Sequence, residues 1–495
     1  NGEIYNFLEL KRKIEKNTSF QTSSDTEIIL EYYNLFGEKC VNYFEGMWSF
    51  VIYDGHKKTL FISRDRFGEK PLYTHFDDSG FYFASEIKFI KALKDKELEI
   101  NYELVNNFLG NGYKCLFKKN TTFFKNIFRL NNSTSLIIKE GVLRKKYNYW
   151  LPKINENKNL SLKDAIILCK QKIINSLKIR LRSDVPIAFC LSGGIDSSSL
   201  VSIAVKELGF KVKTFSIIDQ DPRYDEKKNI EKVIGDLECD SEFIGLKKKN
   251  ILERLDNLVL NHDSPVSTIS YLIHSIISER ASKQGYKVII SGTGADELFT
   301  GYYDHYLYQL KEIKNTEFFQ DNFQNWKKHI FKFIRNPKLK EYKSFFTDKQ
   351  IDHIYDVSNS QKSTLNNKKL DLFSEKKFTS NKLKNRMLNE LFYEITPVIL
   401  HEDDQNSMMH SIENRSPFLD TNIFDLALSL PSHYYIKNGY NKYVLRESMK
   451  GILIDDVRLD RKKKGFNSSI DNLINFKSKK NLDFILDSSS KIFNI

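Results

Sequence analysis

One short segment restricts the fold of this chain more than any other, because it joins an apolar strand to a helix through glycine and serine. Residues Val185–Leu191 are apolar almost throughout, as expected for a strand buried in a parallel sheet. Residues Ser199–Leu208 have the apolar spacing of a helix, which Gly209 ends. The turn between them has the sequence SGGIDSS. A strand, a flexible turn and a helix start in this order favour an α/β fold with an anion site at the turn.

The residue types of this turn suit a phosphate ligand. Gly193 and Gly194 let the backbone come close to a ligand, and the N–H groups at a helix start attract negative charge. Asp196 repels phosphate, so we expect it to hold a Mg²⁺ ion that binds the phosphate. The turn matches neither the Walker pattern nor the dinucleotide fingerprint. A purely structural Gly-Gly turn is the alternative.

Composition excludes several classes of protein. The chain has 495 residues, enough for two to four domains, and its 40% apolar and 28% charged residues are typical of globular proteins. No apolar run reaches the roughly 18 residues that a membrane span needs. The five cysteines have no zinc-ligand spacing and indicate a reducing compartment, so we expect a cytoplasmic protein without a membrane partner.

The net charge of +13 raises the question of nucleic-acid binding. Lysine is scattered along the whole chain together with many Asn, Ile and Phe residues, which indicates a compositional bias. Blocks such as Lys247–Lys249 and Lys462–Lys464 are short. We therefore expect no nucleic-acid partner.

Hydrophobic patterning divides the chain into three stretches. The first 150 residues are rich in predicted strands, including a hairpin of Gly46–Gly55 with Thr59–Asp65. From Leu160, helices alternate with strands, which predicts a parallel sheet covered on both faces. Beyond Gly301 the chain is mainly helical, aromatic and basic, and the polar stretch Ser358–Lys369 is expected to be a surface loop or a disordered insert.

Four further strings carry candidate functional residues. Asn1-Gly2-Glu3, with Asp25 nearby, could hold a zwitterionic amino acid, although turn formation and helix capping by Asp25 are alternatives. Residues 64–73 form a turn dense in charges, for which a salt-bridged loop is the simple interpretation.

The other two strings lie in the second half of the chain. Residues 291–302 follow the strand Lys287–Ile290 and place Asp296 at the edge where α/β sheets bind ligands, which would supply a second Mg²⁺ ligand. Residues 413–420, Lys442 and the basic string 461–466 come last. Late basic residues could stabilise charge developing on a phosphate.

Taken together and in this order, the strings resemble glutamine-dependent asparagine synthetases, from Asn1 to about Asn467. The resemblance implies an N-terminal-nucleophile glutaminase domain with a four-layer αββα sandwich at 1–150. It also implies an ATP-pyrophosphatase-type synthetase domain, parallel α/β with a helical C-terminal part, at 160–495. Such enzymes hydrolyse glutamine, pass ammonia through an internal tunnel, adenylate aspartate with Mg-ATP and release AMP.

The resemblance assigns roles by position. Asn1, Gly2, Glu3 and Asp25 correspond to the glutamine pocket, and Lys442 to a lysine that acts on the transition state. The nucleotide contacts correspond to Leu191, Ser192, Gly193, Gly194, Asp196, Ser197, Ile217, Ser291 and Gly292. The metal ligands correspond to Asp196 and Asp296. We expect ATP and Mg²⁺ as cofactors and small-molecule partners, and we leave a homodimer open.

Two departures from the family pattern affect these expectations. The family's nucleophile is an N-terminal cysteine, whereas this sequence begins at Asn1, so we expect it to begin within the glutaminase domain and to lack glutaminase activity as it stands. Thr293 occupies the position of a catalytic glutamate, and threonine cannot act as a carboxylate base. The acceptor could therefore be aspartate or another carboxylate, such as a uronic acid of a surface polysaccharide.

Two other classes of protein fit the sequence less well than a glutamine-dependent synthetase. An RNA-modifying pyrophosphatase would suit the positive charge, but it has no use for the glutaminase strings and usually needs paired cysteines. A non-enzymatic scaffold would not explain two acidic, glycine-rich turns at strand ends.

Overall fold

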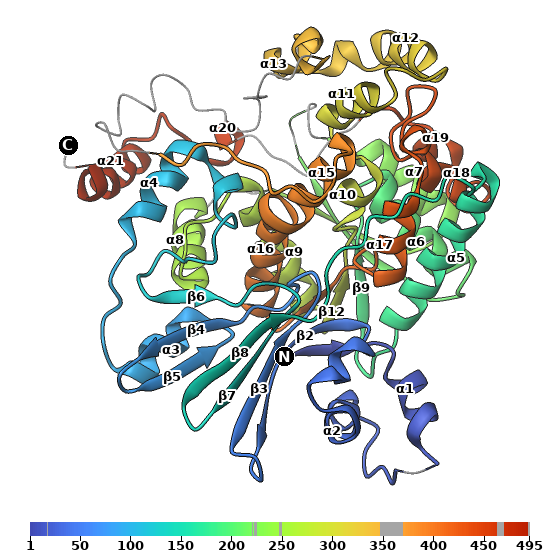
Figure 1. The fold of residues 1–495 in the computed structure, drawn as a ribbon. Coiled ribbons are helices and arrows are strands. Elements are labelled where there is room, and N and C mark those ends of the chain that lie inside the picture. The colour runs from blue at the N-terminus through green and yellow to red at the C-terminus, as the bar shows by residue number, and fades with distance from the viewer. Residues whose placement is uncertain are drawn as a thin grey trace. The chain divides into compact units, whose positions relative to one another are not determined.

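The computed structural model describes residues 1–16, 18–219, 221, 225–246, 250–346, 370–462 and 470–493. The expected loop Ser358–Lys369 and most of the basic string 461–466 lie outside these ranges. The chain forms two compact units, which Figure 1 draws as a ribbon. The first unit holds residues 1–184, 292–404 and 416–450, and the second holds residues 185–291, 405–415 and 451–495.

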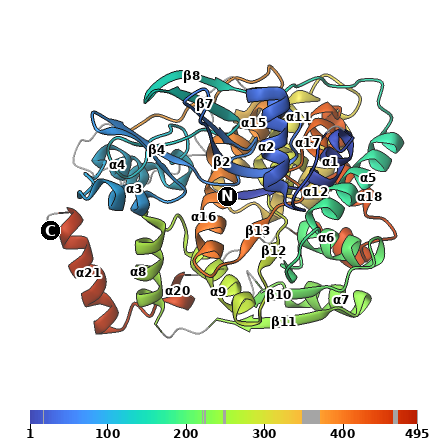
Figure 2. The ribbon, with the colours of Figure 1, turned by 90° about the horizontal axis from the view of Figure 1, so that it is seen from below.

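The second unit is built on a five-stranded, fully parallel sheet with the order β11-β10-β9-β12-β13. Its strands are β9 (Ile187–Cys190), β10 (Lys213–Ile218), β11 (Asp240–Gly245), β12 (Val288–Ile290) and β13 (Glu413–Arg415). Its helices are α6 (Ile195–Lys206), α7 (Lys227–Leu237), α8 (Ile251–His262), α9 (Ile269–Lys283), α19 (Asp455–Arg458), α20 (Ile470–Leu473) and α21 (Lys479–Phe493). Figure 2 shows α6 and α7 beside β10 and β11, which continue the same sheet.

Strands β9 and β12 are apolar on both sides because helices cover both faces of the sheet. Ala188 and Ile289 pack against Ile277 of α9 on one face. Helix α6 packs beside β9 and against α7. The alternation of strands and helices predicted from Leu160 onward is therefore confirmed for the part that forms this unit.

The first unit contains two antiparallel sheets, with the orders β1-β2-β3-β7-β8 and β5-β4-β6. Their strands are β1 (Gly2–Ile4), β2 (Gly46–Asp54), β3 (Thr59–Arg64), β4 (Tyr73–Asp77), β5 (Gly80–Ala84), β6 (Ile127–Arg129), β7 (Thr134–Lys139) and β8 (Val142–Asn148). Early helices are α1 (Phe7–Ile14), α2 (Asp25–Phe36), α3 (Ile87–Lys94), α4 (Tyr102–Asn111) and α5 (Leu162–Arg180). Short 3₁₀ helices lie at η1 (Gly37–Asn42) and η2 (Tyr113–Cys115).

The rest of the first unit is helical. It comprises α10 (Ala295–Phe299), α11 (Tyr303–Glu312), α12 (Phe319–His329), η3 (Phe331–Phe333), α13 (Pro337–Lys340), η4 (Tyr342–Phe346), α15 (Lys382–Asn389), the π-helix η5 (Glu390–Glu394), α17 (Thr421–Ser429), η6 (Ser432–Tyr434) and α18 (Tyr443–Ser448). Helix α16 (Thr396–Met408) runs from the first unit into the second.

The two antiparallel sheets lie between helices in four layers. Leu10 of α1 and Ile28 of α2 pack against Trp48 on one face of the larger sheet. Ile62 on the opposite face packs with Phe81 of the smaller sheet, and Ile87 of α3 belongs to the cluster around Tyr73 and Ile127 beyond it. Figure 1 shows this region with α3 beside β4 and β5. Apolar residues alternate along the strands, and each face therefore has its own core.

Two details differ from the sequence expectations. Helix α6 begins at Ile195 rather than at Ser199, because Gly194 has extended backbone angles and takes the N-cap position, which puts Asp196 in the first helical turn. Residues Glu413–Arg415 form a short edge strand that the sequence did not predict, since three polar residues carry no strand periodicity. Among the described residues, no helix combines the length and apolar character that crossing a membrane requires.

Candidate active site

The first glycine-rich turn lies at the carboxyl end of β9 in the second unit. Leu191 continues the strand by donating its N–H to Phe215 (N···O 3.0 Å) and by accepting from the Ser216 hydroxyl (2.7 Å). The Ser192 N–H donates to the Ser197 hydroxyl (3.1 Å), and the two serine hydroxyls lie 3.0 Å apart. The serines therefore hold the turn against the start of α6.

Two features of the backbone at Gly193 favour glycine there. Its φ is +78°, and a Cβ atom there would lie 3.1 Å from side-chain atoms of Asn229 and Ile230 of α7. Asp196 and Ile217 are half-buried, whereas Ser197 is buried. The nucleotide-contact candidates Leu191, Ser192, Gly193, Gly194, Asp196, Ser197, Ile217 and Ser291 thus all belong to one unit, at or near strand ends.

The second glycine-rich turn follows β12. The Ser291 N–H still extends the sheet by donating to the Arg415 carbonyl (3.0 Å), and at Gly292 the second segment of the first unit begins. Gly294 has φ +93°, and a Cβ there would approach the Leu419 side chain to 2.5 Å. At Gly301 an added Cβ would overlap the Asp296 carboxylate at 1.7 Å. Both glycines therefore make room for close packing around α10, and Thr293, just before Gly294, is half-buried.

Asp296 and Lys442, which the sequence proposed separately, are in contact. Lys442 Nζ lies 2.5 Å from Asp296 Oδ1, and the lysine side chain is only 4% exposed. Lys442 has left-handed backbone angles (φ 53°) and precedes α18, so its placement depends on a specific turn. Asn441 next to it donates to the Gly301 carbonyl (3.4 Å), which ties this turn to the one that carries Asp296.

A second acid, Glu297, follows Asp296 directly on α10. Glu297 is 1% exposed and accepts a hydrogen bond from the Tyr302 hydroxyl (2.6 Å). Burial, together with the neighbouring Asp296 carboxylate, raises the pKa of Glu297 to about 7. An acid placed directly after a candidate metal ligand was the available signal, but burial cannot be read from one residue letter.

A buried charge network lies further along the same unit. His305 Nε2 is 2.5 Å from Glu390 Oε2, and Asp304 completes a group of three donors that could hold a metal ion. Arg386, however, donates to Glu390 (3.0 Å) and lies 3.6 Å from Asp304. This cation already supplies positive charge to the group, so the residues fit an ion-pair network better than a metal site. Burial lowers the pKa of His305, but the Glu390 carboxylate outweighs it and the net shift is upward.

The N-terminal string lies beside Asp25 in the first unit. Gly2 has φ +118°, and a Cβ there would lie 2.1 Å from the Met47 carbonyl, so glycine is required for the pairing of β1 with β2. The Asp25 carboxylate accepts from the Ile4 N–H (2.9 Å), next to Glu3. Asp25 is not the helix cap considered from the sequence, because the Ser24 hydroxyl accepts from Thr26 (3.1 Å) and caps α2.

Asn1 is placed beside two strands. Its side-chain amide donates to the Ser85 hydroxyl (3.2 Å), and its carbonyl accepts from the Ser49 N–H (2.8 Å). Asn1, Gly2, Glu3 and Asp25 are exposed or half-buried, so a ligand could reach them.

The charged turn 64–73 is buried, and it is held by hydrogen bonds to the backbone as well as by a salt bridge. Asp65 is fully buried, and its carboxylate accepts the N–H groups of residues 67 to 70 at 2.7 to 3.0 Å. Arg64 donates to three backbone carbonyls rather than to an acid. Lys70 forms a buried ion pair with Asp404 of α16 (2.9 Å).

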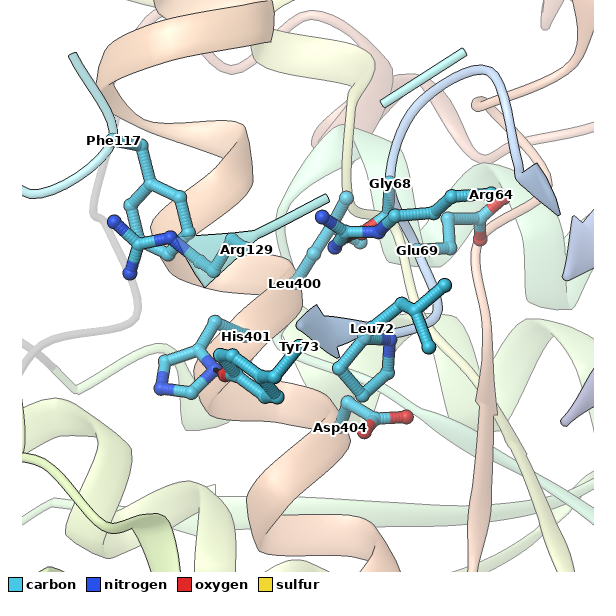
Figure 3. Close-up of a pocket in the computed structure, with 11 residues that line it drawn as sticks. Arg64, Gly68, Glu69, Leu72, Tyr73, Phe117, Arg129, Leu400, His401 and Asp404 are labelled. Atoms are coloured by element: carbon cyan, nitrogen blue, oxygen red, sulfur yellow. Dashed lines mark hydrogen bonds between the residues drawn. The ribbon is translucent and has the colours of Figure 1, made fainter. Parts of the chain in front are cut away.

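Figure 3 shows the small cavity beside this turn. It is bordered by Arg64, Glu69, Tyr73, Arg129, His401 and Asp404, with apolar residues between them. Burial and the nearby Asp65 carboxylate raise the pKa of Glu69 well above its usual value. Burial lowers the pKa of Arg129 to about 10. The sequence indicated a charged turn here but not a cavity, since α16 contributes from more than 300 residues away.

Comparison with known families identifies the class of protein. The glutamine amidotransferase domain family matches residues 1–150, and the asparagine synthase family matches residues 169–492. The second match covers more than half of the chain, and the chain therefore belongs to the asparagine synthase family. The predicted fold class is confirmed with it: a four-layer amidotransferase-type region is followed by a synthase region built on a parallel α/β sheet.

Individual relatives agree with this assignment. The chain is 37% identical over 311 residues to a putative glutamine-hydrolysing asparagine synthetase 2 of Methanocaldococcus jannaschii, covering 62% of this chain and 58% of that protein. It is 27% identical over 499 residues to the glutamine-hydrolysing asparagine synthetase 1 of Bacillus subtilis, covering 94% and 74%. A third relative, amidase chry2 of Gibberella zeae, is 26% identical over 61% of this chain and 46% of its own length.

Solved structures give weaker similarities. An NH3-dependent NAD synthetase from Campylobacter jejuni is 20% identical and covers 29% of this chain and 61% of its own, with a TM-score of 0.20. An NMN synthetase from Francisella tularensis is 14% identical and covers 51% and 94%, with a TM-score of 0.23. Scores this low do not establish a shared architecture over the whole chain.

Proposed function

We propose that the protein is an ATP- and glutamine-dependent amidotransferase. It would activate a carboxylate as its adenylate, releasing pyrophosphate, and aminate it with glutamine-derived ammonia, releasing AMP. The observation that supports this best is the contact of the buried Lys442 ammonium with Asp296 at a glycine-rich turn that follows a parallel strand. A buried cation beside an acid suits a site where phosphate charge develops.

We assign the nucleotide to the turn 191–197 and to Ser291 and Gly292. The turn fits this role because its backbone at Gly193 favours glycine and because α6 begins directly after Gly194. Asp196 and Asp296 would hold Mg²⁺, which neutralises the triphosphate when it is bound. Lys442 would bind the α-phosphate, and Asp296 holds the lysine side chain before substrate arrives.

Asn1, Gly2, Glu3 and Asp25 would hold glutamine. The carboxylates of Glu3 and Asp25 would face its ammonium, and the Asp25 contact with Ile4 N–H fixes one carboxylate against the strand that carries the other. Residues 1–150 would form the glutaminase domain and residues 160–495 the synthetase domain. We further propose a cytoplasmic protein and leave its oligomeric state, including a homodimer, to measurement.

We propose aspartate as the acceptor, which gives asparagine. A second candidate, a uronic acid or another carboxylate, is favoured by Thr293, since its hydroxyl cannot replace the carboxylate found there in asparagine synthetases. Two relatives of this chain are named amidases rather than asparagine synthetases.

The test is a pyrophosphate-release assay with ammonia as nitrogen source. Aspartate and uronic-acid sugar nucleotides would be compared as acceptors at equal concentration. Acceptor-dependent release with aspartate is expected, and release only with a uronic acid would select the second candidate. If no carboxylate stimulates pyrophosphate release, the proposed function is wrong.

A further inference from the structure

A strongly basic segment lies outside the candidate active site. Residues 327–343 hold seven Lys or Arg residues among 17, whereas the whole chain has 77 among 495. The only acid in this segment is Glu341. The seven are Lys327, Lys328, Lys332, Arg335, Lys338, Lys340 and Lys343, and all of their side chains are exposed. This density is more than twice the chain average, so the general lysine bias does not account for it.

The segment is compact rather than extended. Trp326, the residue just before the segment, packs on Tyr342 near its end, with ring centroids 5.4 Å apart, and Lys327 Nζ lies 5.6 Å from the centre of the Tyr342 ring. Trp326, Ile330 and Ile334 are at most 2% exposed and form the interior. We call residues 327–343 the basic lobe. Because its two ends meet, its seven cations are confined to a small volume.

The lobe is attached to the turn that carries Lys442. At Gly439 an added Cβ would lie 3.3 Å from side-chain atoms of His329, so the two segments are in close contact. The Tyr306 hydroxyl of α11 donates to the Gly439 carbonyl (3.3 Å) and accepts from the Asn441 N–H (3.1 Å). Figure 1 draws α12 and α13 beside α11. A ligand held on the lobe would therefore lie close to the segment that precedes Lys442.

The lobe is suited to a polymer of negative charges. A cluster of exposed cations attracts polyanions, and their attraction is weakened by salt. Single-stranded nucleic acids are usually held by exposed aromatic rings on which bases stack. Here the rings of Phe323, Trp326 and Tyr342 pack on one another, and Lys327 covers two of them. The lobe's own rings, Phe331, Phe333 and Tyr342, are half-buried, and Lys332 Nζ lies 5.2 Å from the centre of the Phe333 ring. The lobe thus offers charge without a fully exposed ring for stacking, which favours a chain of carboxylates over a chain of bases.

We propose that the basic lobe binds an acidic polysaccharide whose sugars carry carboxylates, and that it brings such a chain close to the synthetase site. Binding itself does not depend on the reaction, but the placement of an acceptor rests on the proposed function. The lobe would then select carboxylates carried on a polymer over free small acids.

Binding of polygalacturonate to the protein, measured without ATP by calorimetry at several salt concentrations, tests the proposal. The parent should bind, and affinity should fall with salt. The triple variant Lys328→Gln, Lys340→Gln, Lys343→Gln should bind on the order of tenfold more weakly. The matched triple variant Lys158→Gln, Lys163→Gln, Lys178→Gln removes equal charge from exposed positions elsewhere and should bind as the parent does.

Three results would overturn the proposal. The first is that the parent does not bind polygalacturonate, and the second is that both triple variants bind it equally more weakly than the parent. The third is that the parent binds single-stranded RNA or anionic lipid vesicles more tightly than polygalacturonate at matched charge. Pyrophosphate release with aspartate and ammonia should be unchanged in both triple variants. No carboxylate-dependent release by the parent, with polymer binding intact, would count against the proposed function and not against the lobe.

Discussion

The two glycine-rich turns look alike in sequence but are built differently. The turn at 191–197 is held by hydroxyl groups, with Ser192 and Ser197 bonded to each other, and it carries Asp196 in the first turn of α6. The turn at 291–302 is held by close packing around Gly294 and Gly301, and its Asp296 is already paired with a buried lysine. The first has the features of a phosphate cradle. The second has the features of a site where charge changes during a reaction.

The surroundings of the turns differ in the same way. The sheet behind the first turn has an apolar core, with Ala188, Phe215 and Ile289 almost fully buried. The second turn belongs to a unit with many buried charges, among them Arg180 and Asp420, and Arg180 also pairs with the half-buried Glu45. An apolar core supports rigid placement, whereas buried charges make stability and activity sensitive to pH.

The largest expected effect on activity comes from removing the carboxylate of the first turn. Asp196→Ala should abolish pyrophosphate release, because the triphosphate would lose its metal ligand at the cradle. Asp184→Ala, which changes an exposed acid just before β9, is the control and should retain activity. Release at the parent rate by the Asp196 variant would contradict the assignment of the first turn.

The next effect belongs to the second turn. Lys442→Ala should lower turnover by about 10²- to 10³-fold, in the range found when a group that stabilises transition-state charge is removed. The affinity for ATP, measured by calorimetry, should change far less. Lys450→Ala alters an exposed lysine after the same helix and should have little effect. A fall in ATP affinity as large as the fall in turnover would make Lys442 a simple nucleotide-binding residue.

Packing around the second turn predicts a smaller, purely structural effect. Gly294→Ala should lower the free energy of unfolding by about 2–4 kcal/mol, because it adds a clash with Leu419 to the strain of a positive φ. Gly209→Ala is the matched variant, with φ +61° and no atom within 4 Å, and should cost only about 1–2 kcal/mol. Urea unfolding measures both. Equal losses would show that the Leu419 contact relaxes at no cost.

The smallest effect concerns the buried charges. Burial and the Asp420 carboxylate raise the pKa of Glu45 to about 7, above the 4.5 of an unperturbed glutamate. An acid with a raised pKa favours its protonated form in the folded state. Its contribution to the free energy of unfolding is therefore full below about pH 4.5 and is lost as pH rises through 7. Glu45→Gln should flatten this decline between pH 5 and pH 8 in urea unfolding. An unchanged slope would mean that other groups cause it.

Much of the framework was predictable because its signals are local. The strand before the first turn, the hairpin of β2 and β3 and helix α2 follow from apolar runs, alternation and an N-terminal Ser-Asp. Edge strand β13 was not predictable, since its pairing with β12 depends on a partner more than 120 residues away. The position of α6 was misjudged by four residues because serines hid the helical pattern.

The site was predicted as separate residues and not as contacts. Lys442 and Asp296 could each be singled out, but a contact across 146 positions has no signal in one sequence. Glu297 went unassigned because its importance comes from burial and from the Tyr302 hydroxyl. The burial of the turn at 64–73 was missed for a related reason, since charged residues usually lie at the surface.

A double-mutant cycle tests most directly whether Asp196 and Asp296, which belong to different compact units, bind the same Mg-ATP. The dissociation constant of Mg-ATP would be measured by calorimetry, which needs no turnover, for the parent, Asp196→Asn, Asp296→Asn and the double variant. Ligands of a shared ion should be coupled, with a double variant that departs from additivity by about 0.5–3 kcal/mol. Strict additivity within about 0.5 kcal/mol would contradict a common metal site.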